Sequence, residues 1–452
     1  MSRIFLISSN VNTDPYPVYP LGMAVVASAL TTAGHRVCQY DYLADGRSAL
    51  HLQTSLKKFS PDFVGISLRN IDNVDSFSAE DDWYLDDVRT LVAAIRQVTA
   101  APVIVGGPGF SIMPQDILEY IAADFGVVGE AERALCDLIA QLEQRQGIPR
   151  IVNQQSVLLS ATEMAPPCWD ETLIRFYVER SGMVNLQTKR GCPHKCLYCS
   201  YPDLEGRRLR PMDPNAVVDE IQRLKQAFDV NTIFFTDSVF NDNAGHYLIF
   251  AEELLQRNAK ITWYAFFRPQ GIGLKELRLL KRSGLTAMEV GTDAASDATL
   301  DGLNKQFTFE DVFAFNRASI KAEIPTAHFI IFGGPGETTA TVQEGLRNIQ
   351  KLKQCVVFAF AGIRIYPNTG LYAYALKEGI LAENNSLLKP LYYFSPTLDL
   401  EIMNTTIETA FRGRRDRIFP PSESLIRIAT MNRFGYRGLL WDKLISFKNT
   451  RI

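Results

Sequence analysis

The chain has 452 residues, a length that favours two or three domains over one. Hydrophobic residues make up 46% and charged residues 21%, and no apolar run approaches the ~20 residues of a membrane-spanning helix, so we expect no membrane span. The net charge of −3 provides no general basic field, which counts against a nucleic-acid partner. No signal peptide is visible and four of the seven cysteines are scattered singly, so we predict a cytoplasmic protein.

Strand-like and helix-like segments alternate through the first third of the chain. Helical periodicity covers residues 21–34 and 86–98. Short runs rich in β-formers read as buried parallel strands over residues 3–10, 37–42, 63–68, 103–106 and 125–128. This alternation predicts a doubly wound, Rossmann-like α/β domain over residues 1–145, with its ligand beyond the carboxyl ends of the strands.

The loops at those carboxyl ends form a glycine-rich mouth in this prediction. They cover residues 10–22, 67–70, 106–109 and 129–130. A Gly-x-Gly-x-x-Gly fingerprint does not follow the first strand, which counts against a dinucleotide. Glycines after strands are often only turns, so each loop alone is weak evidence for a site.

Residues 146–183 are expected to be a linker, because Ala165-Pro166-Pro167 interrupts a stretch of weak periodicity. Cys168 lies within it. A packed or free thiol is the favoured interpretation of Cys168, and a metal ligand is the alternative.

Three cysteines then lie close together in one loop. Cys192, Cys196 and Cys199 follow a strand-like segment, and Gly191 and Pro193 break that strand. A zinc site normally has four protein ligands in two pairs, and the chain has no second Cys-x-x-Cys. Three thiolates suit a 4Fe-4S cluster with one iron open to a small ligand, whereas inert core cysteines or a disulfide are the less favoured alternatives.

A second series of strand–helix units follows the cysteines. Its predicted strands end near residues 236, 293, 332 and 367, and polar or glycine-rich turns follow them. Such repeats indicate a partial (β/α)6 barrel over residues 184–375, with a site at the carboxyl ends of its strands. Residues 376–452 are expected to form a small, mainly helical extension that closes the barrel or shapes a substrate pocket.

The barrel segment resembles the radical S-adenosylmethionine (SAM) core. Cys192, Cys196 and Cys199, with Tyr198 before the last cysteine, match the family's catalytic cluster loop. The resemblance implies that SAM contacts the ends of the following strands, at Asp237, Ser238, Glu289, Asp293, Gly334 and Gly336. The usual Gly-Gly-Glu is absent, and Asp293 stands where relatives often have glutamate.

The first domain resembles the cobalamin-binding domain that precedes many radical SAM enzymes. The resemblance places the cofactor's nucleotide tail at Gly106 and Gly107, and the lower face of cobalt near Ser67, Leu68 and Arg69. Gly129 and Glu130 lie at the same predicted mouth. No Asp-x-His-x-x-Gly follows the first strand, so the resemblance implies cobalamin without a histidine ligand. Arg364 is expected to pair with a cofactor carboxylate, or else with another residue.

The resemblance also implies a reaction. SAM is cleaved reductively to a 5′-deoxyadenosyl radical, which takes hydrogen from an unactivated carbon, and methylcobalamin supplies a methyl group to that carbon. Cyclisation or rearrangement without methylation is one alternative, and a sensor without turnover is another. The implied partners are an electron donor such as flavodoxin or ferredoxin and a small-molecule substrate. Aromatic residues near the C-terminus favour an apolar substrate, such as a lipid or a natural-product intermediate.

Overall fold

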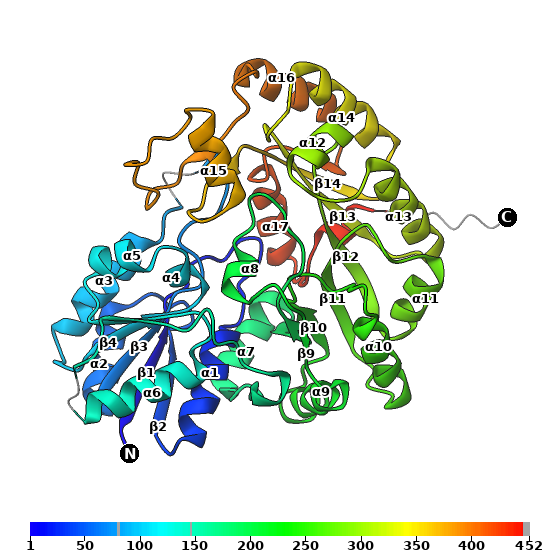
Figure 1. Ribbon diagram of the computed structural model, residues 1–452. Coiled ribbons are helices and arrows are strands. Elements are labelled where there is room, and N and C mark those ends of the chain that lie inside the picture. Colours follow the sequence, from blue (N-terminus) through cyan, green and yellow to red (C-terminus); the bar gives the residue numbers. More distant parts are fainter. Residues whose placement is uncertain (79–81, 145–146, 446–452) are drawn as a thin grey trace.

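The computed structural model describes residues 1–78, 82–144 and 147–445 (Figure 1). The first sheet has six parallel strands in the order β2-β1-β3-β4-β5-β6. They are β1 Arg3–Ser8, β2 Arg36–Asp41, β3 Phe63–Ser67, β4 Val103–Gly106, β5 Phe125–Val128 and β6 Ile151–Asn153. The chain adds β2 on one side of β1 and then adds β3 to β6 on the other side. The position between β1 and β3 is therefore the switch point where ligands of such folds bind.

Helices cover both faces of this sheet, so the predicted doubly wound architecture is confirmed. Helices α1 (Leu21–Thr32) and α6 (Ala131–Glu143) share a core on one face. Helices α2 (Ala49–Phe59), α3 (Leu85–Arg96) and α5 (Pro114–Ile121) pack on the other. The strands have almost no exposed side chain because both faces are covered, which explains their continuous apolar sequence.

The second sheet is an open, curved one with seven parallel strands in the order β17-β14-β13-β12-β11-β10-β7 (Figure 1). Its strands are β7 Val184–Leu186, β10 Thr232–Phe235, β11 Thr262–Phe267, β12 Leu285–Asp293, β13 Thr326–Phe332, β14 Val356–Ala361 and β17 Arg417–Ile418. The helices between them lie along its outer side: α9 Pro214–Phe228, α10 His246–Gln256, α11 Leu274–Arg282, α13 Phe309–Ala322 and α14 Thr339–Lys351. The predicted partial barrel is therefore confirmed, with β17 added from the C-terminal region.

Two segments differ from the prediction. The segment predicted as a linker contributes β6 to the first sheet and forms helix α7 (Glu171–Ser181). The strand expected to end near residue 367 is interrupted, because the chain turns at Gly362 after β14. The next two residues, β15 (Ile363–Arg364), pair antiparallel with β16 (Tyr392–Tyr393) of the C-terminal region. The domain boundaries themselves remain predictions.

The C-terminal region combines helices with these short strands. It contains α15 (Gly370–Lys377, which begins just before it), α16 (Leu400–Phe411) and α17 (Glu423–Arg433). Its last described turn, η2 (Trp441–Leu444), packs with inward-facing side chains of the barrel sheet. Over the described part of the chain, no helix combines the length and the apolar character that crossing a membrane requires.

Candidate active site

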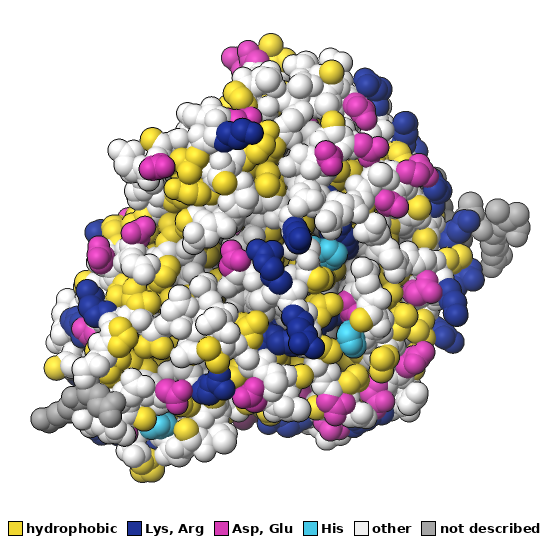
Figure 2. Space-filling model, in the orientation of Figure 1, with side chains coloured by type: hydrophobic (Ala, Val, Ile, Leu, Met, Phe, Trp, Pro, Cys, Tyr) yellow, Lys and Arg dark blue, Asp and Glu magenta, His cyan; other side chains and the backbone are white. Residues whose placement is uncertain are grey.

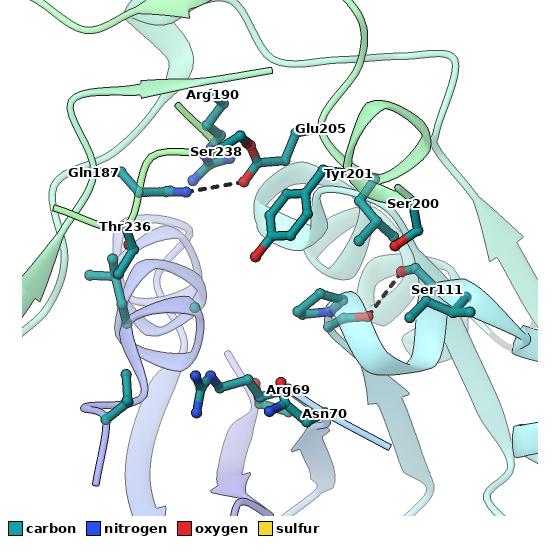
Figure 3. Close-up of a pocket in the computed structure, with 18 of the residues that line it drawn as sticks. Arg69, Asn70, Ser111, Gln187, Arg190, Ser200, Tyr201, Glu205, Thr236 and Ser238 are labelled. Atoms are coloured by element: carbon teal, nitrogen blue, oxygen red, sulfur yellow. Dashed lines mark hydrogen bonds between the residues drawn. The ribbon is translucent and has the colours of Figure 1, made fainter. Parts of the chain in front are cut away.

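A cavity of about 830 Å³ lies between the carboxyl ends of the two sheets. Its walls come from both domains, so neither sheet forms the site alone. Figure 3 shows Arg69 and Asn70 of the first domain facing Gln187, Tyr201 and Ser238 of the second across this space. The volume lies at the upper end of the range of small-molecule sites.

The three cysteines line this cavity, as the sequence predicted for a common site. Backbone hydrogen bonds hold the loop, because Cys192 N–H donates to Gly206 (3.0 Å) and Leu197 N–H donates to Leu303 (3.0 Å). Gly191 has φ +90°, and a Cβ there would lie 2.1 Å from the Arg208 carbonyl oxygen, so only glycine fits. The loop conformation is therefore set by its neighbours.

The cysteines do not converge on a single point. Among the residues that the structure describes, no three His, Cys, Asp or Glu side chains are grouped as one metal ion would require. A cluster of several irons has a different need, because each thiolate binds a different iron atom. Burial raises the pKa of Cys199 to about 12 and also raises the pKa of Cys192, so metal binding must displace protons from both thiols.

Two buried cations accompany the thiols. Arg268, which follows β11, and Lys305 both line the cavity, and both are more than nine-tenths buried. Their charges act on Cys192 in the direction that favours its thiolate. Burial, reinforced by these two cations, lowers the pKa of His194 to about 4, so this imidazole is neutral at physiological pH.

Tyr198 and Asp293 meet beside the cysteines. The Tyr198 hydroxyl donates to Asp293 Oδ2 at 2.6 Å, and Lys305 forms an ion pair with the same carboxylate. Both residues line the cavity at the position where the resemblance implied SAM.

Asp237 does not face the cavity as a free ligand. Its carboxylate accepts hydrogen bonds from the Thr188 N–H (2.7 Å) and hydroxyl and lies 3.7 Å from Lys189 Nζ. Its side chain is fully buried, so its contacts are those of a structural residue. Asp237 and Ser238 both line the cavity, and the Ser238 hydroxyl donates to Glu205 Oε2 at 2.9 Å.

Glu205 is a further acidic group that lines the cavity at this end of β10. It also accepts hydrogen bonds from Gln187 Nε2 (3.0 Å) and Gly191 N–H (3.2 Å), and Figure 3 shows the bond to Gln187. Burial raises the pKa of its carboxyl. Sequence reasoning missed it, because Glu205 belongs to a loop after α8 (Tyr201–Leu204) rather than to a strand end.

Glu289 lies deeper in the barrel than the cavity-lining residues. Its Oε1 accepts a hydrogen bond from Trp441 Nε1 at 3.1 Å, and its neighbour across the sheet is Phe266 of β11. Gly334 and Gly336 also do not line the cavity. The Glu337 carboxylate accepts hydrogen bonds from the Gly333 and Gly334 N–H groups. The predicted SAM contacts at these three positions remain predictions.

We expect Glu289 to make stability depend on pH. Burial raises the pKa of its carboxyl from 4.5 to about 7. As pH rises, the unfolded chain loses this proton first, so the free energy of unfolding should fall by about 3 kcal/mol between about pH 4.5 and 7. Denaturant unfolding of the wild type and Glu289→Gln over this range measures it. The difference between the two proteins should shift in favour of Glu289→Gln as the pH rises from about 4.5 to 7, and a constant difference over this range would contradict the prediction.

The first domain contributes Ser67, Arg69, Gly106, Gly107 and Gly129 to the cavity wall. Gly107 has φ +101°, and a Cβ there would lie 2.6 Å from the Leu68 carbonyl oxygen. The two predicted loops are therefore in backbone contact, and Leu68 itself is buried beneath them. The Arg69 side chain is exposed to this space and has no hydrogen-bond or ion-pair partner among the described residues.

Glu130 and Arg364, both predicted as cofactor ligands, are engaged by other residues of the chain. Glu130 forms buried ion pairs with Arg190 and Arg210, and Arg364 forms one with Asp72. Glu130 still lines the cavity, whereas Arg364 does not. The ion-pair alternative for Arg364 is thus confirmed.

Arg268, Lys305 and Tyr201 were also missed from the sequence. Arg268 was detectable in principle, because it directly follows β11 and so lies at the same sheet edge as the other strand-end residues. Lys305 follows a short helix, α12 (Asp297–Gly302), rather than a strand, and no sequence motif marks its position. Tyr201 comes two residues after Cys199, and its exposed ring projects into the space shown in Figure 3.

Two family models match the chain. The model of the B12 binding domain matches residues 7–139, and that of the radical SAM superfamily matches residues 186–349. The first segment contains β2 to β5 and most of α6, and the second contains β10 to β13 and the cysteine loop. The seven-stranded sheet with its cysteine loop and the glycine-lined first domain are therefore each similar to a known family.

Curated relatives span most of the chain. A tryptophan 2-C-methyltransferase of Streptomyces laurentii is 24% identical over 441 residues, covering 80% of this chain and 73% of the relative. An anaerobic magnesium-protoporphyrin IX monomethyl ester cyclase of Cereibacter sphaeroides is 26% identical over 352 residues, covering 73% of this chain and 56% of the relative.

A solved structure has the same fold over nearly its full length. It is the radical SAM methyltransferase TsrM of Kitasatospora setae, determined with cobalamin and a [4Fe-4S] cluster bound. Its TM-score is 0.84 at 23% identity, covering 98% of this chain and 97% of TsrM. The likeness shows that the two chains share a fold.

Proposed function

We propose that this chain is a cobalamin-binding radical SAM enzyme, as its two family matches and its relatives support, and that it transfers a methyl group to an unactivated carbon of a small-molecule substrate. The observation that carries the proposal is the single cavity that contains the three cysteines on one wall and the glycine-lined loops of the B12-binding domain on the other. When bound, the cluster, SAM and cobalamin supply a radical that removes hydrogen from carbon and a methyl group for transfer.

The residues present fit an iron–sulfur cluster with SAM. Three thiols supply the ligand type that such clusters require, and they open onto a cavity rather than into the core. Arg268 and Lys305 offset the negative charge of the thiolates. We propose that Tyr198, Asp293 and Ser238, together with Glu205, hold SAM beside them.

The residues also fit cobalamin bound without a histidine ligand. Of the described residues that line the cavity, His194 is the one histidine, and it lies beside the cysteines. The first-domain wall instead offers Gly106, Gly107 and the unpaired Arg69. We propose that the glycines allow the nucleotide tail to approach the backbone and that Arg69 lies against the corrin.

The protein's own task is positioning and exclusion of water. The cavity is lined by both domains, and we propose that the bound cofactors and substrate together exclude water from it. Phe266 lines this space and is 40% exposed, and it contacts Phe234 with ring centroids 5.0 Å apart. We propose that this aromatic wall favours an apolar or aromatic substrate, and tryptophan is the first compound to test because a relative is named for it.

We propose that an acidic electron donor, such as flavodoxin or ferredoxin, reduces the cluster. Lys and Arg side chains gather near the middle of the face shown in Figure 2. Next to the cysteine loop, Lys195, Arg207 and Arg208 are exposed, and the backbone at Gly206 and Arg208 contacts the loop. Positive charge at this position favours association with a negatively charged partner.

The test of the proposed function is turnover by anaerobically reconstituted enzyme with reductant, cobalamin and SAM that carries a deuterated methyl group. We expect release of 5′-deoxyadenosine and, with a true substrate, a product heavier by one labelled methyl group. Absence of 5′-deoxyadenosine with every candidate substrate would favour a sensor. The second candidate function is cyclisation, which the name of a relative supports. Mass spectrometry distinguishes it from methyl transfer, because a cyclised product gains no deuterated methyl group.

A further inference from the structure

Buried ion pairs join the two domains on one flank of the cavity. Glu130, which follows β5 of the first sheet, pairs with Arg190 (3.1 Å) and Arg210 (2.7 Å) of the second domain. These arginines lie on β8 (Lys189–Arg190) and β9 (Arg210–Pro211), an antiparallel pair next to the cysteine loop. Glu132 of the first domain also pairs with Arg190 at 2.7 Å. All four side chains are at most 10% exposed.

A second buried pair joins the domains through the loop after β3. Asp72 pairs with Arg364 of β15, with Nε 2.9 Å from Oδ2, and the two side chains are 1% and 2% exposed. Arg364 also donates to the Ile365 and Leu387 carbonyl oxygens. Asp72 and the neighbouring Tyr366 line the cavity, and Tyr366 donates to Asp72 Oδ1 at 3.4 Å.

Each pair is close in sequence to a proposed cofactor site. Arg190 precedes Cys192 by two residues, Glu130 follows Gly129, and Asp72 follows Arg69 by three. A desolvated ion pair is costly to separate, because each charge would remain buried without its partner. These contacts therefore restrict movement of the cysteine loop relative to the first-domain wall.

We infer that the Glu130–Arg190–Arg210 network and the Asp72–Arg364 pair fix the separation of the two cofactors. Their members are positioning residues that act through the backbone of both sites. The need for such positioning is physical, since a displacement of about 1 Å at reacting groups can cost about 100-fold in rate. The inference rests on the proposed function, because it requires cobalamin and the cluster in one molecule.

Pulsed electron paramagnetic resonance tests this inference on the holoenzyme. The reduced cluster and cob(II)alamin are both paramagnetic, so their distance distribution is measurable in frozen protein. We expect a single narrow distribution in the wild type and a broader one, shifted to longer distances, in Asp72→Asn and in Glu130→Gln. Asp219→Asn is the matched control, because it breaks the exposed Arg257–Asp219 pair within the second domain and should leave the distribution unchanged.

Iron and cobalt contents, measured on every sample, separate the possible outcomes. If the wild type lacks cobalt or iron, the proposed function fails. If both cofactors are present and both variants keep the narrow distribution while only their Tm falls, the pairs merely stabilise the fold and the inference is overturned. Should one variant not fold, the other pair tests the inference alone. Arg364→Lys keeps a positive charge opposite Asp72, so its distribution of cluster–cobalt distances should be narrower than that of Arg364→Met.

Discussion

The variant Cys196→Ala is expected to purify with cobalamin but without the broad visible absorbance of an iron–sulfur cluster, and to release no 5′-deoxyadenosine. Its physical basis is the ligand count, since three thiolates are the fewest that hold the cluster with one open iron. Cys196 is partly exposed to the cavity and lies outside the apolar cores, so its loss should not unfold the chain. Iron analysis and chromatography of the reaction mixture measure both effects.

Cys168→Ala is the matched control for this experiment. Cys168 is also partly exposed, but it packs in the core shared by α1 and α7, and its carbonyl accepts a hydrogen bond from Gln39 at 2.8 Å. It does not line the cavity. We expect this variant to retain its iron and its 5′-deoxyadenosine release. Full iron content in Cys196→Ala, or lost iron in Cys168→Ala, would contradict the assignment of the ligands.

Gly106→Leu is expected to fold and bind the cluster but to lose cobalamin. A Cβ at Gly106 meets only ordinary contacts, the nearest being the Val127 carbonyl oxygen at 3.5 Å. The rest of a leucine side chain would enter the space that we propose for the nucleotide tail. Overpacking of about 1–3 kcal/mol corresponds to about 5- to 150-fold weaker binding. Spectrophotometric titration of the protein with cobalamin measures the change.

Two comparisons make the result specific. Gly147→Leu places the same side chain at an exposed glycine with nothing within 4 Å of its Cβ, and it should bind cobalamin as the wild type does. Gly107→Ala is less informative, because its positive φ and the 2.6 Å approach to Leu68 predict a folding defect. Unchanged affinity in Gly106→Leu would show that cobalamin does not approach this turn.

Most strands were predictable from the sequence because their signal is local. β1, β3, β4 and β5 are continuous apolar runs bounded by turn residues, and their predicted and observed ranges differ by at most two residues. β11 (Thr262–Phe267) was not predicted, and β14 (Val356–Ala361) precedes the strand that was expected to end near residue 367. β6, β16 and β17 were missed as well. Each of these three has two or three residues, too few to show a period, and each is a strand only because a neighbouring strand supplies its hydrogen bonds.

The sequence by itself determined the fold class, the two-domain order and the cysteine loop, because each depends on a pattern of residues that are close together along the chain. Tertiary structure alone decided the partners of the charged residues. Asp72 and Arg364 are 292 residues apart, and Glu130 and Arg210 are 80 apart, so no local pattern connects them. A buried charge must be neutralised by whichever opposite charge the fold brings to it. For this reason Glu130 and Arg364 became contacts between the domains, although their positions at strand ends had indicated cofactor ligands.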